Sequence, residues 1–97
     1  MALTERTEND KIEVVGPYKH IQVRKATVIE KDGVELTRSF ERYVLNIGGI
    51  DSEDNLVDTD LSNEDVDVQA ICTAAWTDAV KESWRLKLIS DRDSVPQ

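Results

Sequence analysis

The sequence contains few side chains that could perform covalent or acid–base chemistry, among them one histidine, His20, and one cysteine, Cys72. Catalysis by His20 needs an orienting acid and a nucleophile within hydrogen-bond reach, and no spacing in the sequence points to them. Cys72 lies in the apolar stretch AICTAAW (70–76), which is typical of a buried, protonated thiol. A Cys72–His20 pair is compatible with the residues, but no spacing supports it. Phosphate-binding glycine loops, zinc-ligand spacings and serine-nucleophile elbows do not occur. We therefore predict no enzyme, no catalytic residue and no cofactor.

A run of acids is the other chemical feature. Residues 51–67 carry eight acids and no base, which equals the whole formal charge of -8. A calcium loop that began at Asp58 would need glycine at its sixth position and a bidentate acid at its twelfth, where the chain has Asn63 and Gln69. We therefore predict no metal site. The run is interpreted either as a solvated loop that leads into a helix, or as an imitation of a nucleic-acid backbone that binds a basic partner.

Charge and hydropathy limit the partners and the location. The acidic field disfavours direct nucleic-acid binding and attraction to anionic lipid. No run of about 18 apolar residues occurs, and the first residues lack an apolar core, so we expect neither a membrane span nor a signal peptide. With one cysteine no intrachain disulfide can form, which favours a reducing compartment, either a cytoplasm or a virus particle assembled in one.

The 97 residues predict a single α+β domain. It consists of a long antiparallel β-hairpin, with or without a third short strand, followed by an acidic loop and one or two C-terminal helices. The expected segments are a flexible terminus, a β-hairpin region, an acidic loop, a helical region and a tail, at residues 1–10, 11–47, 48–62, 63–90 and 91–97.

The hairpin prediction centres on Asp32-Gly33, which lies between two β-prone runs and favours a type I′ turn. If Lys31 pairs with Val34, Val23 faces Arg42 and Arg24 faces Glu41. A three-residue turn would shift this register by one, so the register stays open. A shorter β-prone run, Lys11–Val15, ends at Gly16-Pro17. A ribbon this long, with bases along it, is expected to project from the body.

Helix signals follow the acidic loop. Ser62 and Asp65 approximate a capping box and predict a helix that begins at Ser62. Thr77-Asp78 can cap a second helix, and one continuous helix is the alternative. The aromatic residues are assigned to core packing by default, but several of them could instead contact a partner, namely Trp76, Trp84, Tyr43 and Phe40. Because the core is small and the hairpin has open edges, we expect a homo-oligomer or a tight complex with another protein.

Two stretches, IEVVGPYKHIQVRKATVIEKDGVELTRSFERYVL (12–45) and VQAICTAAWTDAVKESW (68–84), resemble small uncharacterised bacteriophage proteins, especially those of marine phages and cyanophages, encoded near tail or tail-fibre genes. The resemblance implies a structural or assembly role associated with the tail or virion, and a location in the virion or the host cytoplasm. The partner would be a second copy or another virion protein. The alternative is an acidic phage regulator that binds and inhibits a host protein.

Overall fold

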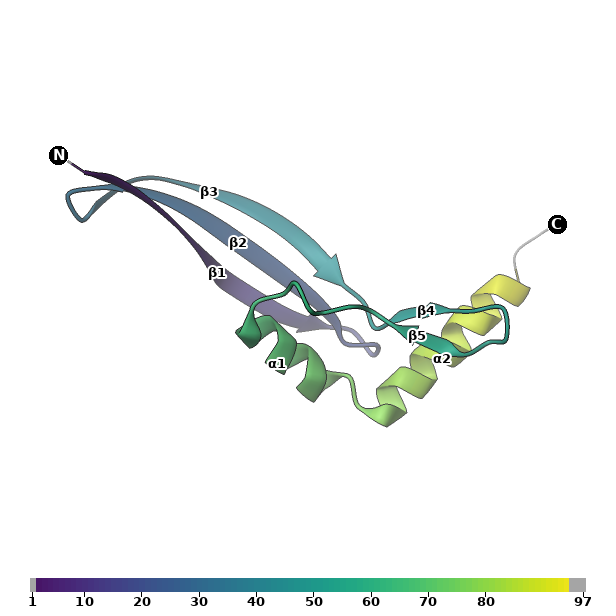
Figure 1. Cartoon of the computed structure of the whole chain (residues 1–97). Helices are drawn as coiled ribbons and strands as arrows, with labels where there is room; N and C mark the ends of the chain where they lie inside the picture. Colours follow the sequence, from purple (N-terminus) through teal and green to yellow (C-terminus); the bar gives the residue numbers. More distant parts are fainter. Residues whose placement is uncertain (1, 95–97) are drawn as a thin grey trace.

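The structure, a computed structural model, describes residues 2–94 and has an α+β fold (Figure 1). A three-stranded antiparallel sheet in the order β1-β2-β3 comes first, then a small hairpin of β4 and β5, then two helices. The elements are β1 (Leu3–Val15), β2 (His20–Lys31), β3 (Val34–Leu45), β4 (Gly48–Ile50), β5 (Leu56–Asp58), α1 (Val66–Ala75) and α2 (Asp78–Asp93). Of the predicted tail, residues 91–93 belong to α2 and residues 95–97 lie outside the described part.

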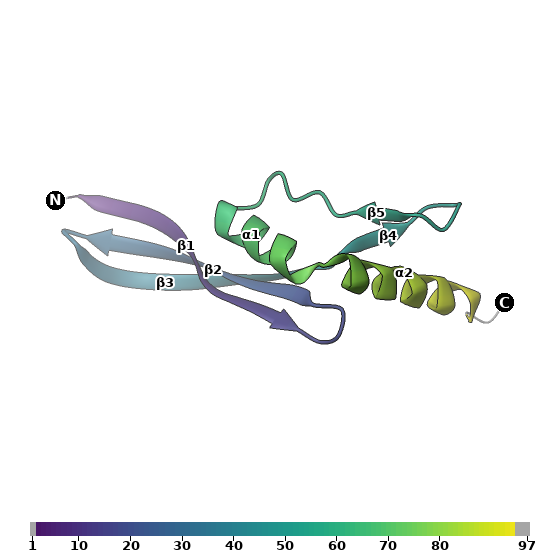
Figure 2. The same ribbon diagram turned by 90° about the horizontal axis from the view of Figure 1, so that it is seen from below.

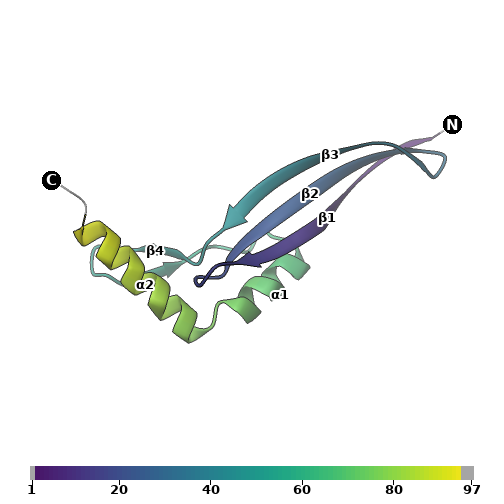
Figure 3. The ribbon, with the colours of Figure 1, turned by 180° about the vertical axis from the view of Figure 1, so that it is seen from behind.

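The molecule is elongated, with extents of 60 × 30 × 22 Å and a radius of gyration of 18.0 Å. A compact domain of this length would have a radius of gyration of about 12–13 Å. Both helices lie near one end of the sheet, which we call the base, while the other end extends beyond them (Figures 1 and 2). The view from behind shows the same uncovered distal half (Figure 3). The prediction of a projecting ribbon is therefore confirmed.

The prediction of a frayed terminus at residues 1–10 is wrong, because β1 begins at Leu3 and pairs with β2 along its length. Without β1, the backbone N–H and C=O groups on that side of β2 would lack strand partners. The charged side chains of this segment also find partners in the neighbouring strands. Arg6 Nε lies 2.6 Å from Glu30 Oε1, and Arg38 bonds Glu8 at 3.0 Å. The third strand is thus long rather than short.

The turn between β2 and β3 has the predicted positive φ at both central residues, 52° at Asp32 and 83° at Gly33. Lys31 pairs with Val34 as expected, but the register then shifts because Leu36 is an extra residue on β3. Of the two registers that the sequence left open, the one shifted by one residue therefore holds beyond the bulge. Arg24 faces Arg42 rather than Glu41, and Val23 faces Tyr43 rather than Arg42.

This bulge decides which β3 side chains reach the core. Tyr43 and Leu45 share a face with Val23 and Ile21 and pack, partly buried, against the core cluster to which those two belong. Arg42 falls on the opposite face, which the helices do not cover. We call the covered face the inner face and the opposite one the outer face.

The first helix begins later than predicted, and the two helices are separate. α1 begins at Val66 with Asp65 as its N-cap, whereas the Ser62 N–H donates to Asp60 Oδ1 at 2.9 Å in a turn. The second cap is confirmed, since Thr77 Oγ1 accepts from the Val80 N–H at 3.3 Å. No helix among residues 2–94 has both the length and the apolar character needed to cross a membrane.

The core lies between the base of the sheet and the helices. Its buried members are Ile21, Val23, Ile47, Val68, Cys72, Trp76 and Trp84. Both indoles also donate hydrogen bonds to backbone carbonyls. Trp76 Nε1 donates to Lys19 O at 2.7 Å, and Trp84 Nε1 donates to Gly48 O at 2.8 Å. The helices are thereby fixed to the β1–β2 turn and to β4.

Gly48 supplies a direct test of this arrangement. It has φ of 150°, and a Cβ there would lie 2.1 Å from Val57 O, whereas a Cβ at Gly49 would meet nothing within 4 Å. We expect Gly48→Ala to lower the free energy of unfolding by about 2 kcal/mol or more, because backbone must move. Gly49→Ala, the matched control, should change it by less than about 1 kcal/mol. Chemical denaturation of both variants measures this, and equal effects would contradict the placement of β4 against β5.

Candidate functional site

His20 and Cys72, the two candidates for chemistry, both serve packing. The His20 ring packs in a cluster with two aromatic rings, with its centroid 5.2 Å from that of Trp84 and 6.4 Å from that of Tyr18. Cys72 is fully buried in α1. Burial raises the pKa of its thiol, and the nearby Glu64 carboxylate raises that pKa further. A thiol held protonated in this way is a poor nucleophile.

A cavity of about 230 Å³ lies beside Cys72, between the helices and the chain that follows β5. Its lining includes Trp76 and Ile47 from the core, with Lys81 and Asp58 as its charged members. Lys81 Nζ lies 3.6 Å from Asp58 Oδ1, so the two charges pair with each other. The cavity therefore offers no unpaired charge to a ligand.

Most carboxylates of the acidic segment, residues 51–67, are used within the fold. Asp51 accepts from the N–H groups of Glu53 and Asn55, at 2.8 and 2.9 Å. Asp54 binds Arg92 at 2.5 Å. In all, seven of the eight acids contact another group of the chain: Asp51, Asp54, Asp58, Asp60, Glu64, Asp65 and Asp67. No group of three or more His, Cys, Asp or Glu side chains within residues 2–94 is arranged to hold a metal ion. The acids of this segment therefore hold it against the helices and the sheet.

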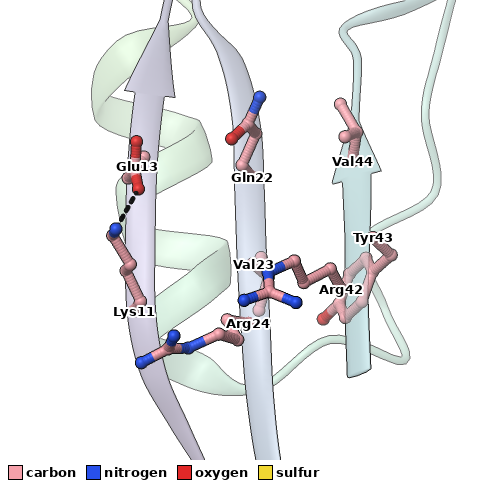
Figure 4. A pocket seen from close by; sticks show the side chains of 8 residues that line it. All are labelled: Lys11, Glu13, Gln22, Val23, Arg24, Arg42, Tyr43 and Val44. Atoms are coloured by element: carbon pink, nitrogen blue, oxygen red, sulfur yellow. Dashed lines mark ion pairs between the residues drawn. The ribbon is translucent and has the colours of Figure 1, made fainter. Parts of the chain in front are cut away.

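The outer face of the sheet carries a different set of charges. Near the base it forms an open depression of about 290 Å³, lined from all three strands by side chains that include Lys11, Glu13, Gln22, Arg24, Arg42 and Val44 (Figure 4). Arg24 forms a bidentate pair with Asp10, at 2.9 and 2.7 Å, and Lys11 pairs with Glu13 at 2.9 Å. Arg42 reaches from β3 toward β2 and forms no ion pair within residues 2–94. This places one unpaired cation on an open face.

Further from the base, arginine side chains lie across the outer face, which no helix covers. Ala26 and Val28 of β2 point to this face and are fully buried. The Arg24 guanidinium lies 4.4 Å from the Phe40 ring centroid, and Arg38 bonds both Glu35 and Glu8, at 2.9 and 3.0 Å. Long arginine side chains bury apolar surface while their charged heads stay in water. This half of the sheet therefore buries its central apolar residues without a helix and stays open to contact.

The distal tip of the sheet carries exposed apolar side chains that the sequence analysis did not single out. Leu3 is 69% exposed, Val34 64% and Leu36 57%. Leu3 pairs with Lys31, and Lys31 pairs with Val34, so they form one row across the sheet. The apolar residues next to the Asp-Gly turn were a signal for this patch. Leu3 could not be recognised, because it was assigned to a frayed terminus.

The four residues predicted as partner contacts are placed in different environments. Trp76 and Trp84 are 7% and 8% exposed in the core. Tyr43 is half-buried, and its hydroxyl donates to Glu64 Oε1 at 2.6 Å. Phe40, on the outer face, is 46% exposed. Of the four, Phe40 is the most exposed to a partner.

Comparison of the chain with protein-family models, with curated proteins and with solved structures gave no match. The function is therefore argued from the geometry above.

The packing role of Cys72 gives a second prediction. We expect Cys72→Ala to keep the fold and the assembly state, at a cost of about 1 kcal/mol from a small cavity. Native protein near neutral pH should react with a thiol reagent far more slowly than unfolded protein. Rapid labelling of the native chain, or loss of activity in a folded alanine variant, would contradict the packing role of Cys72 and would indicate a reactive thiol.

Tyr43 gives a prediction on pH. Burial raises the pKa of its phenol above the ordinary value of 10.0, and hydrogen bonding to Glu64 raises that pKa further. Folding therefore stabilises the protonated phenol, and this contribution is complete below pH 10 and is lost as the pH rises above it. The free energy of unfolding should fall more steeply above about pH 10 in the wild type than in Tyr43→Phe. Parallel curves for the two proteins would contradict this role of Tyr43.

Proposed function

We propose that this protein is a non-enzymatic structural or assembly protein that acts through protein–protein contact at the distal half of its sheet. The observation that carries the proposal is the uncovered distal sheet with its exposed apolar tip, Leu3, Val34 and Leu36. Three large aliphatic side chains in one exposed patch are typical of an interaction site. The contact partner is a second copy of the chain or another protein of the same particle.

A bacteriophage particle, at its tail or elsewhere in the virion, is the setting that we propose, either in the assembled virion or in the host cytoplasm where it is built. The support for this setting is the resemblance of residues 12–45 and 68–84 to small phage proteins. The shape adds a physical reason, since an elongated sheet with a core at one end can anchor in one place and reach another.

The regulator hypothesis uses the acidic segment, and the contacts do not favour it. An acidic inhibitor needs its carboxylates displayed in the geometry of a basic partner. Seven of the eight acids here make contacts within the chain, which fix the path of the segment. Asp54 and Asp58 also pair with bases of α2, so these contacts support a structural role for the segment. Mass spectrometry of purified particles separates the two functions, because a structural part occurs there in fixed copy number and a regulator does not.

The apolar tip can supply only part of the energy of association. Burying the exposed part of three aliphatic side chains contributes roughly 3–5 kcal/mol. Association costs at least about 4 kcal/mol in lost translational and rotational freedom. A stable contact therefore needs further surface near the tip.

A substitution at the tip tests the contact surface. Leu36→Lys should weaken association tenfold or more, because it replaces an exposed apolar side chain of the tip by a charged one, while the melting temperature stays close to that of the wild type. Leu86→Lys is the matched control, since Leu86 is 53% exposed against 57% for Leu36 and lies on α2, away from the tip. Sedimentation velocity over a concentration series measures both variants. Equal weakening by the two variants, or a wild type that stays monomeric and is absent from particles, would contradict the proposal.

A further inference from the structure

β3 is an open edge of the sheet along most of its length. The order β1-β2-β3 gives β3 a strand partner on one side only. Its bulge at Leu36 lies near its start, so Thr37–Leu45 pairs with β2 without interruption. An edge strand of this length presents a row of unpaired backbone N–H and C=O groups, which is a template for another strand.

The opposite edge, β1, is less suited to pair with a copy of itself. Its register shifts between Asn9 and Lys11, near its middle, and the Asn9 side chain there is bonded to Asp65 at 2.7 Å. β1 carries four acids and two bases, a net charge of -2, whereas β3 carries two of each and is neutral. β3 also has four exposed apolar residues: Val34, Leu36, Phe40 and Val44.

We propose that two copies of this chain pair through their β3 edges, antiparallel and centred on Ser39, to form one continuous sheet with three strands from each copy. This inference rests on the proposed function and names its partner as a second copy. The two copies are related by a two-fold axis perpendicular to the sheet, and each residue stays on its own face. Residues that lie opposite each other must point to the same face, so the axis passes through one position of β3. The residue at that position lies opposite the same residue of the second copy.

Charge selects Ser39 as that residue. If Arg38 or Glu41 lay at the two-fold axis, it would lie opposite the same charged residue of the second copy. If Phe40 lay at the axis, Arg38 of each copy would lie opposite Arg42 of the other. Like charges directly opposite on a sheet are destabilising. A centre at Ser39 places Arg38 opposite Phe40 on the outer face, a cation–π arrangement, and brings no like charges together. On the inner face it places Thr37 opposite Glu41.

Both ends of β3 exclude other centres. Toward the tip, the bulge at Leu36 interrupts the ladder. A centre at Arg42 opposes two arginines. Closer still to the base, the chain after β5 returns past β3. The Thr59 N–H donates to Ile47 O at 2.9 Å, just beyond the end of β3, and the Tyr43 hydroxyl donates to Glu64. The segment left for pairing is Thr37–Glu41, five residues, which is a common strand length.

The same register gives the exposed Phe40 a partner, because Phe40 of each copy lies beside Arg38 of the other. Val34 and Leu36 lie on the same strand just beyond the paired segment, at the tip. The tip and the edge are thereby parts of one contact surface.

Disulfide trapping tests the register. In a Cys72→Ala background, Ser39→Cys places two thiols opposite each other, with Cα atoms about 4.5–5.5 Å apart, which a disulfide can bridge. Thr37→Cys and Glu41→Cys are the matched controls on the same face of the same strand. Their thiols are offset by four residues, about 13 Å, which exceeds the reach of a disulfide. We expect mild oxidation of the full-length variants to yield at least tenfold more crosslinked dimer from Ser39→Cys than from either control.

The outcomes separate this inference from the proposed function. If the wild type sediments as a dimer but Ser39→Cys crosslinks no better than the controls, the β3 pairing is wrong while association at another surface stands. If the wild type stays monomeric and Ser39→Cys does not crosslink, the pairing is also wrong, and the particle composition then decides the proposed function. Preferential crosslinking at Ser39 together with a Leu36→Lys variant that does not dimerise supports both.

Discussion

Two indole hydrogen bonds determine where the helices lie, and the rest of the molecule depends on that position. Trp76 donates to Lys19 O in the β1–β2 turn, and Trp84 donates to Gly48 O on β4. α1 has ten residues, too few for a stable isolated helix, so its stability comes from packing on the sheet. Because both anchoring carbonyls lie at the base, the helices cover the base alone. The distal half of a long sheet is consequently left without a helical layer.

That distal half is held by its cross-strand hydrogen bonds and by ion pairs on the outer face. The arginine side chains of β1, β2 and β3 reach carboxylates on neighbouring strands and cover Ala26 and Val28. Exposed ion pairs contribute little each, so the cover provides specificity and solubility more than stability. Its effect on function is that both β3 and the tip remain available to another chain.

The sequence predicted the fold class, the Asp32-Gly33 turn and the Thr77 cap, because each depends on local residue types. It missed what depends on distant contacts. The strand at residues 3–10 is polar by composition and becomes ordered because β2 offers it a backbone ladder. The bulge at Leu36 follows from the need to bring Tyr43 and Leu45 to the core, which no local pattern reveals. At the tip, Leu3 and Val34 both pair with Lys31, although they are 31 residues apart in the sequence. Only the register of the strands shows that they lie in one row.

Hydrogen exchange of the full chain at low and high concentration measures most directly whether the distal sheet is a contact surface. Those amides of residues 37–41 that point away from β2 should exchange at least tenfold more slowly at high concentration, because the open edge of β3 gains backbone partners there. The amides of α2 should exchange at the same rate at both concentrations. Unchanged exchange at residues 37–41, with slowing at the helices instead, would contradict the assignment of the distal sheet as the contact surface.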